Sequence, residues 1–284
     1  MVWSPTGRRS EVASDDSGSA LTGLTPAMGS EMTVEAEAPL HRRQYRNPPV
    51  IEAICRIQWS EPIPWNVTTP GLLFERLRDV YPEEPKAQAA VAAEVQPGSG
   101  FQLRSGLQKM AFSTGGGSRL LIVGPQDVAA HCLQPYEGWE SLESRLYEGI
   151  DHISSLLTET TVSMAGLRYV NRVEIPGSTV RFDEYLTISI GFPEGFPSEL
   201  GAFLDRTEMY YPGEPVKMAF TWASVESPPE TSAFVLDLDL YWTPEPPAEL
   251  DVARQALGDL KTKEGTAFES LLQDRLREMF DEIR

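Results

Sequence analysis

The sequence predicts an α+β protein: a twisted antiparallel sheet with long helices packed on it, arranged as two similar strand-helix-strands-helix halves. Residues 50–59 and 166–176 alternate apolar and polar side chains, as half-buried strands do. Apolar residues recur at helical spacing from Trp139 to Leu157. The order of strand, helix, several strands and helix is then repeated, which predicts an internal duplication.

The predicted domains follow a leader. Residues 1–44 are rich in small and polar residues and have no sustained apolar period, so their composition predicts a disordered leader. The first half is expected over 45–160 and the second over 161–284. Asn47-Pro48-Pro49 forces an extended entry into the first strand, because a residue before proline avoids the helical region.

The first half continues with a helix over 71–81, opened by Thr69-Pro70. A linker over 83–99 leads to short strands between 101 and 133. Gly115-Gly116-Gly117 separates two of these strands, and since a strand and not a helix follows, a hairpin turn is favoured over a phosphate loop.

The second half shows the same order of elements after its first strand. A short helical piece is expected near 182–186, strands near 187–191, 202–211, 216–223 and 232–242, and helices over 248–261 and 266–283, with a break at Lys263-Glu264-Gly265. The strands follow from alternation and the helices from their apolar stripes.

The strand GLRYVNRVEIP, residues 166–176, carries an amide in its apolar row. Asn171 lies on the same face as Leu167, Tyr169 and Val173. We expect its side chain to bond backbone or side-chain groups on the packed face and so to fix the register of the strand.

Four charged residues form the predicted ligand-binding site: Glu52, Arg56, Arg168 and Arg172. If the opening strands of the two halves lie side by side, these side chains gather on one sheet face. Guanidinium groups bind carboxylate or phosphate with planar, bidentate geometry. The alternative is an Arg–Glu ladder across a solvated face.

A second pair of candidates lies in VLDLDLYW, residues 235–242. Asp237 and Asp239 share a strand face and could hold magnesium, or could simply face solvent. Three histidines and two cysteines are too few for a zinc site, and the adjacent His131 and Cys132 point to opposite faces of a strand. No metal site other than the weak aspartate pair is therefore expected.

Charge and composition limit the class of protein. The net charge is −18, and residues 183–251 hold 14 acidic against 2 basic groups, which disfavours duplex nucleic acid as a partner. No apolar run is long enough to span a membrane, and no secretory signal is recognisable. Cys55 and Cys132 are expected as buried free thiols, which favours the cytoplasm.

Motifs of common enzymes and cofactors are missing from the sequence. There is no P-loop, dinucleotide fingerprint or nucleophile elbow, so no cofactor is expected. Five tryptophans could form a stacking platform for bases. All but Trp65 fall on periodic apolar rows and are expected in the core: Trp59, Trp139, Trp222 and Trp242.

Four segments resemble those of a known family: RNPPVIEAICRIQW, PGLLFERL, PYEGWE and GLRYVNRVEIP. The chain is similar over residues 45–283 to an uncharacterised family, sporadically distributed among bacteria and archaea, with an NPP-strand opening and a G-L-R-Y-x-N-R strand. The resemblance implies the boundary of the folded part and no activity.

Two functions follow from the sequence. The first is a non-enzymatic cytoplasmic binding or interaction module that engages a protein partner through a sheet groove or its acidic second half. The alternative is an enzyme or binder acting on an anionic or phosphorylated small molecule, with Arg56, Arg168 and Arg172 holding the anion and Glu52 as base or metal ligand. Whether the chain is an enzyme stays open.

Overall fold

The fold is known from a computed structural model, which describes residues 43–88, 91–96, 100–105, 109–157, 160–197 and 201–283. The predicted leader lies outside these residues except for Arg43 and Gln44, which already belong to the folded part: Arg43 pairs with Glu282, and the Gln44 carbonyl accepts a bond from the Ile283 amide. The strands are β1 (Val50–Trp59), β2 (Lys86–Gln88), β3 (Val91–Gln96), β4 (Gly100–Ser105), β5 (Lys109–Ser113), β6 (Arg119–Val123), β7 (Asp127–Leu133), β8 (Val162–Pro176), β9 (Leu204–Tyr210), β10 (Val216–Val225) and β11 (Thr231–Trp242). The helices are α1 (Thr69–Leu77), α2 (Trp139–Ile153), α3 (Leu250–Leu271) and α4 (Asp274–Phe280), with short 3₁₀ turns η2 (Ser154–Leu156) and η3 (Phe182–Glu184).

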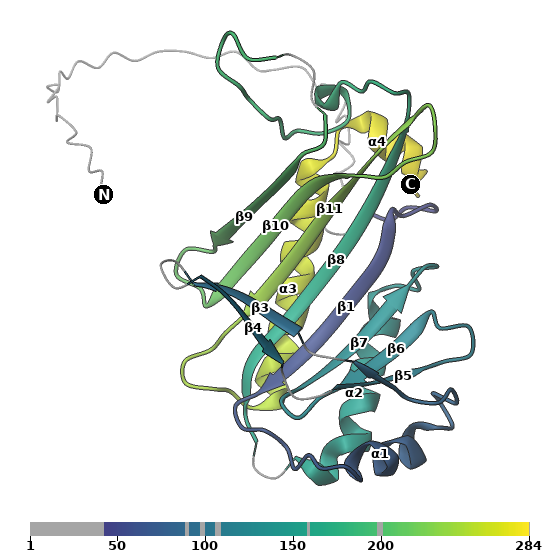
Figure 1. The fold of residues 1–284 in the computed structure, drawn as a ribbon, viewed down its shortest axis with the longest axis vertical. Coiled ribbons are helices and arrows are strands. Elements are labelled where there is room, and N and C mark those ends of the chain that lie inside the picture. Colours follow the sequence, from purple (N-terminus) through teal and green to yellow (C-terminus); the bar gives the residue numbers. More distant parts are fainter. Residues whose placement is uncertain are drawn as a thin grey trace, which may run out of the picture. The chain divides into compact units, whose positions relative to one another are not determined.

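A nine-stranded antiparallel sheet organises the chain, in the order β2-β5-β6-β7-β1-β8-β11-β10-β9. β3 and β4 form a separate two-stranded sheet. The strands that open the two predicted halves, β1 and β8, are neighbours at the centre, with Cys55 opposite Leu167 (Figure 1). The expected α+β class and the pairing of the opening strands are therefore confirmed.

The helices pack on one face of the large sheet, here called the helix face. α2 contacts β7 and β1, and α3 contacts β8 and β11; Figure 1 shows both helices behind the sheet. Every second residue of each strand points to the helix face, and most of these residues are apolar and buried. Trp59 and Trp222 are among its largest fully buried side chains, so their predicted place in the core is confirmed. Trp139 and Trp242, predicted there too, are only partly buried and pack against the core.

Asn171 lies on the helix face and is 1% exposed. Its Nδ2 donates a hydrogen bond of 3.2 Å to the carbonyl oxygen of Leu236 on β11. Leu236 is the residue directly opposite Asn171 in the ladder. A slip of one residue would carry the amide to the other face, so this bond ties the register of β8 against β11, as the sequence predicts.

The C-terminal helices differ from the prediction. The expected break at Lys263-Glu264-Gly265 is wrong, because α3 runs unbroken to Leu271. Glu264 and Gly265 are buried on the helix, and the packing of this face offsets the cost of about 1 kcal/mol that glycine adds to a helix. The chain leaves the helix at Leu272, which forms a β-bridge with Leu186.

The segment between η3 and β9 also differs from the prediction. The strand expected near 187–191 is absent from the described residues, where Leu186 makes only an isolated bridge. The Thr187 amide donates to the Leu271 carbonyl, so this stretch bonds to the end of α3 instead of joining the sheet.

The glycine run between β5 and β6 forms the predicted hairpin turn. Gly116 and Gly117 have φ angles of 92° and 70°, which non-glycine residues rarely adopt. The Gly117 amide donates to the Thr114 carbonyl at 2.9 Å.

Both cysteines are free and buried, as expected. Within the described residues, no helix has the length and apolar character needed to cross a membrane.

Candidate functional site

The four residues predicted as a ligand site lie on the sheet face opposite the helices, here called the opposite face. They do not meet at one point. Arg56 is opposite Gly166, whereas Arg172 lies six positions further along β8, a distance of about 20 Å at the rise of a strand. Glu52 and Arg168 lie between them, so the four side chains form a line and not a single cluster.

Two of the arginines pair with the aspartates of β11. Arg168 donates from Nε and Nη2 to both carboxylate oxygens of Asp237, at 2.8 and 2.7 Å. Arg56 Nη2 lies 2.8 Å from Asp239 Oδ1, and its guanidinium lies 4.7 Å from the centre of the Tyr241 ring. The hydrogen bond to Asp237 raises the pKa of Arg168 above its usual value.

These pairs also bear on the magnesium alternative. Asp237 and Asp239 are 7% and 5% exposed, so they are buried and not solvent-facing. Each is already paired with an arginine, Asp237 with Arg168 and Asp239 with Arg56. Across the part of the chain that the structure describes, no group of three or more His, Cys, Asp and Glu side chains could hold a metal ion.

The other two predicted residues also have partners. Glu52 Oε1 lies 2.8 Å from His131 Nδ1, and this hydrogen bond lowers the pKa of Glu52 although partial burial opposes it. Arg172 donates to Glu174 at 2.8 Å and to the carbonyl oxygen of Glu226 at 2.8 Å. The opposite face thus carries a row of ion pairs. Unlike the expected Arg–Glu ladder on a solvated face, two of them join an arginine to a nearly buried aspartate.

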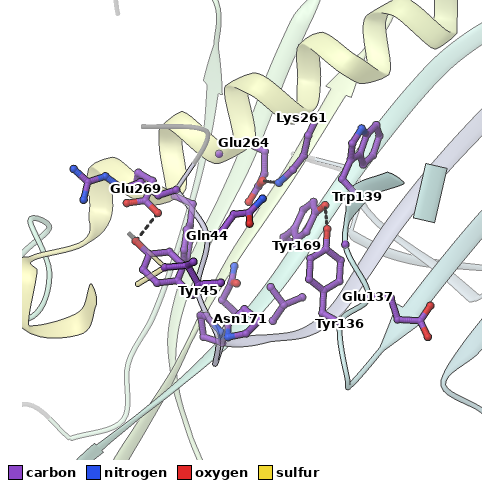
Figure 2. A pocket seen from close by; sticks show the side chains of 18 of the residues that line it. Gln44, Tyr45, Tyr136, Glu137, Trp139, Tyr169, Asn171, Lys261, Glu264 and Glu269 are labelled. Carbon is purple, nitrogen blue, oxygen red and sulfur yellow. Dashed lines mark hydrogen bonds and ion pairs between the residues drawn. The ribbon is translucent and has the colours of Figure 1, made fainter. Parts of the chain in front are cut away.

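A pocket lies on the helix face, where β1 and β8 approach α3 and the start of α2. Its volume is about 760 Å³, within the usual range for ligand sites. Figure 2 shows Lys261 and Glu264 reaching from α3 toward Tyr169, while Glu137 points away from the tyrosines. The polar and aromatic residues of the lining are Arg43, Gln44, Tyr45, Tyr136, Glu137, Trp139, Glu140, Tyr169, Asn171, Lys261, Glu264, Phe268 and Glu269.

Three of the quoted sequence segments meet in this pocket. RNPPVIEAICRIQW contributes Pro48 and Pro49, PYEGWE contributes residues 136–140, and GLRYVNRVEIP contributes Tyr169 and Asn171. These segments are far apart in the sequence and are brought together by the β1–β8 pairing and by the turn from β7 into α2.

A tyrosine pair forms the floor of the pocket. The hydroxyl oxygens of Tyr136 and Tyr169 are 2.7 Å apart, and the rings meet edge to face at 5.6 Å. Burial raises the pKa of both hydroxyls, so both stay protonated at neutral pH. Lys261 Nζ lies 4.3 Å from the centre of the Tyr169 ring and donates to Glu264 at 2.6 Å.

A second polar group lies at the other end of the pocket. The Tyr45 hydroxyl donates to Glu269 Oε1 at 2.7 Å, and Arg277 Nε lies 3.3 Å from the other oxygen of that carboxylate. Burial and the neighbouring carboxylate raise the pKa of Tyr45. Glu264 and Glu269 are each only 3% exposed, so α3 directs two nearly buried carboxylates into the pocket lining.

Sequence reasoning missed this site. The clearest signal was the spacing of Ala253, Leu257, Leu260 and Glu264, which places a carboxylate in the buried stripe of a helix. A charged residue in such a stripe is a functional candidate, because burial of an ionised group is costly. The polarity of Lys263-Glu264-Gly265 indicated a helix break instead.

Comparisons with known proteins add little. No family model matches the sequence, and no curated protein matches it. Among solved structures, a chain described as Methanococcus jannaschii TBP aligns with 76% of this chain and 97% of its own length, at 11% identity and a TM-score of 0.24. A likeness at this level supports neither a shared fold nor a shared function.

Proposed function

We propose that the chain is a non-enzymatic binding module whose pocket receives a basic side chain of a partner protein. The observation that carries the proposal is the pair of nearly buried carboxylates, Glu264 and Glu269, in one pocket with three tyrosines. Carboxylates together with aromatic ring faces are the groups that bind ammonium and guanidinium ions.

The charge of the pocket supports a cationic ligand. Its lining contains four glutamates against two cationic residues, Lys261 and Arg43. Lys261 already lies between the Glu264 carboxylate and the Tyr169 ring, which indicates that this spot accommodates an ammonium group. The net charge of −18 favours the approach of a basic partner and disfavours an acidic one.

The pocket is also preorganised. Tyr136 and Tyr169 hold each other through their hydroxyls, and Glu269 is held by Tyr45 and Arg277. Side chains fixed in this way lose little conformational freedom when a ligand binds, which favours recognition.

The test is a titration of the full chain with a fluorescent lysine-rich peptide, with a glutamate-rich peptide of equal length as the control, followed by anisotropy. We expect the lysine-rich peptide to bind and the glutamate-rich peptide not to bind. Glu264→Gln should weaken the affinity for the lysine-rich peptide by about tenfold, the effect of losing roughly 1.4 kcal/mol. The matched control is Asp237→Asn, which removes a buried carboxylate from the opposite face and should leave affinity unchanged. Equal affinity of Glu264→Gln and wild type, with both folded by circular dichroism, would contradict the proposal.

A second candidate function is anion binding at Arg172, one of the four residues of the site predicted from the sequence. Arg172 lines a smaller pocket of about 430 Å³ together with Glu174 and Phe280, and this observation favours it. Phosphate should then raise the melting temperature of the wild type but not of Arg172→Ala. An equal shift in both proteins would eliminate this site, since the anion would bind elsewhere.

We further propose that residues 45–160 and 161–284 are copies of one unit. The two halves have corresponding elements, which supports this proposal. β7 and β11 each pair with the opening strand of their half, and each is followed by a helix, α2 or α3, on the helix face. Superposition of the two halves in an experimentally determined structure would test this relation.

The resemblance to the uncharacterised bacterial and archaeal family and the cytoplasmic location stand as further proposals. The two buried free cysteines favour a reducing compartment. Fractionation of cells that express the chain, followed by detection in the soluble or the membrane fraction, tests the location.

A further inference from the structure

β9 forms one edge of the nine-stranded sheet, next to β10 (Figure 1). All seven of its residues are exposed, including Leu204 and Tyr210, each 73% exposed. An edge strand presents a row of unpaired backbone groups that can pair with another strand. The opposite edge strand, β2, has only three residues and offers a much shorter row.

The free backbone groups of β9 can be assigned from its bonds to β10. The Ser224 amide donates to the Phe203 carbonyl, and the Tyr211 amide donates to the Val216 carbonyl. In an antiparallel ladder, hydrogen-bonded pairs alternate with pairs that are not bonded. The odd-numbered residues of β9 therefore bond to β10, and the amides and carbonyls of Leu204, Arg206, Glu208 and Tyr210 point outward.

We propose that β9 pairs antiparallel with β9 of a second copy of this chain, with the two-fold axis at Thr207. In this register Arg206 faces Glu208 of the second copy, and Leu204 faces Tyr210 of the second copy. The two-fold axis repeats each of these pairs, and all four pairs use the outward backbone groups, so the two sheets join into one. A symmetric interface of this kind must be self-complementary, and the sequence LDRTEMY is.

Charge selects this register over its neighbours. A two-fold axis at Arg206 would place Arg206 against its own copy, and an axis at Glu208 would do the same for Glu208. Like charges directly opposite each other destabilise a sheet. Within the described residues neither Arg206 nor Glu208 has an ion-pair partner, and Arg206 bonds only to the Thr221 hydroxyl, at 3.0 Å. Both charges are thus available for the second copy.

The pairing also covers apolar surface. Leu204, Met209 and Tyr210 are among the exposed large hydrophobic residues of the chain. In the proposed register Leu204 and Tyr210 contact each other twice, once at each end of the interface, which removes apolar area from water. The interface does not use the pocket between α3 and β8, so it can be tested separately from the binding function.

The experiment is sedimentation equilibrium over a concentration series, with charge reversals at the edge. The wild type, of 31.5 kDa, should reach the mass of a dimer. Arg206→Glu and Glu208→Arg should each weaken the dimer by about tenfold, because each creates two repulsive pairs. The double variant Arg206→Glu/Glu208→Arg restores complementary charges and should recover the wild-type dissociation constant. Glu61→Arg, which reverses an exposed charge in the loop after β1, is the matched control and should have no effect.

Disulfide trapping tests the register itself. Thr207→Cys should form a cross-linked dimer on mild oxidation, because unbonded pairs place their Cα atoms about 4.5 Å apart, within the reach of a disulfide. Asp205→Cys should not, since it faces Met209 of the second copy. A wild type that stays monomeric throughout, single reversals without effect, or equal cross-linking of the two cysteine variants would each overturn the proposal.

Discussion

The Tyr136 hydroxyl lies 2.7 Å from the Tyr169 hydroxyl, and this contact joins the turn before α2 to the central strand β8. Tyr169 is 2% exposed, so its hydroxyl has little access to water and depends on this bond. The contact therefore links the two predicted halves at the floor of the pocket, and it can be measured as a pairwise coupling.

Removal of either hydroxyl should destabilise the fold. We expect Tyr136→Phe and Tyr169→Phe each to lower the free energy of unfolding by about 1 kcal/mol, and the double variant to cost little more than one of them. Urea denaturation of the four proteins measures the coupling. Tyr211→Phe, which alters a half-buried hydroxyl outside the pocket, is the control and should be neutral. Strictly additive losses would show that the hydroxyls do not interact.

The Arg168–Asp237 pair should be more costly to break than to replace. Arg168→Met leaves the nearly buried Asp237 carboxylate without its bidentate partner, and we expect a loss of about 3 kcal/mol. The double variant Arg168→Met/Asp237→Leu removes both charges and should be more stable than the single one. Thermal denaturation ranks the stabilities of the wild type and the two variants. A double variant less stable than the single one would contradict this account.

Glu52 should contribute to the pH dependence of stability. Its pKa is lowered in the folded state by the hydrogen bond to His131. The unfolded state therefore takes up the proton first, and the stabilisation is present above the unfolded pKa of about 4.5 and is lost as pH falls through the folded value. Glu52→Gln should show a weaker loss of stability below pH about 4.5 than the wild type. The exposed Glu61→Gln is the control, and identical profiles for Glu52→Gln and the wild type would refute the role of Glu52.

The two thiols should be inert in the folded protein. Cys55 and Cys132 are 0% and 1% exposed, and burial raises the pKa of Cys55, which disfavours the reactive thiolate. A thiol-specific chromogenic reagent should label neither cysteine in the native state and both in urea. Rapid labelling of the native protein would show that the core opens locally.

Much of the sheet is predictable from the sequence because strand alternation is a local signal. The bounds of Val50–Trp59 agree with the prediction, and the role of Asn171 follows from its place in an apolar row. Partners across the sheet are not local. Nothing within the strand indicates that the side chain of Arg168 pairs with Asp237, which lies 69 residues away in the sequence.

The pocket was harder to predict for the same reason. Tyr45, Tyr136, Tyr169 and Glu264 come from four separate segments, and only the tertiary fold brings them together. Glu264 also stands in a polar stretch beside a glycine, where local propensity favours a helix end. Packing against the sheet overrides that propensity and carries the carboxylate into the pocket.

The central claim is that the pocket on the helix face binds a basic side chain, and photo-cross-linking tests it most directly. A lysine-rich peptide with a photoreactive group should cross-link within residues 43–50, 136–140 and 261–269, the segments that supply most of the pocket lining. Mass spectrometry of the digested complex locates the cross-links. Cross-links confined to β10 and β11 on the opposite face would contradict the account.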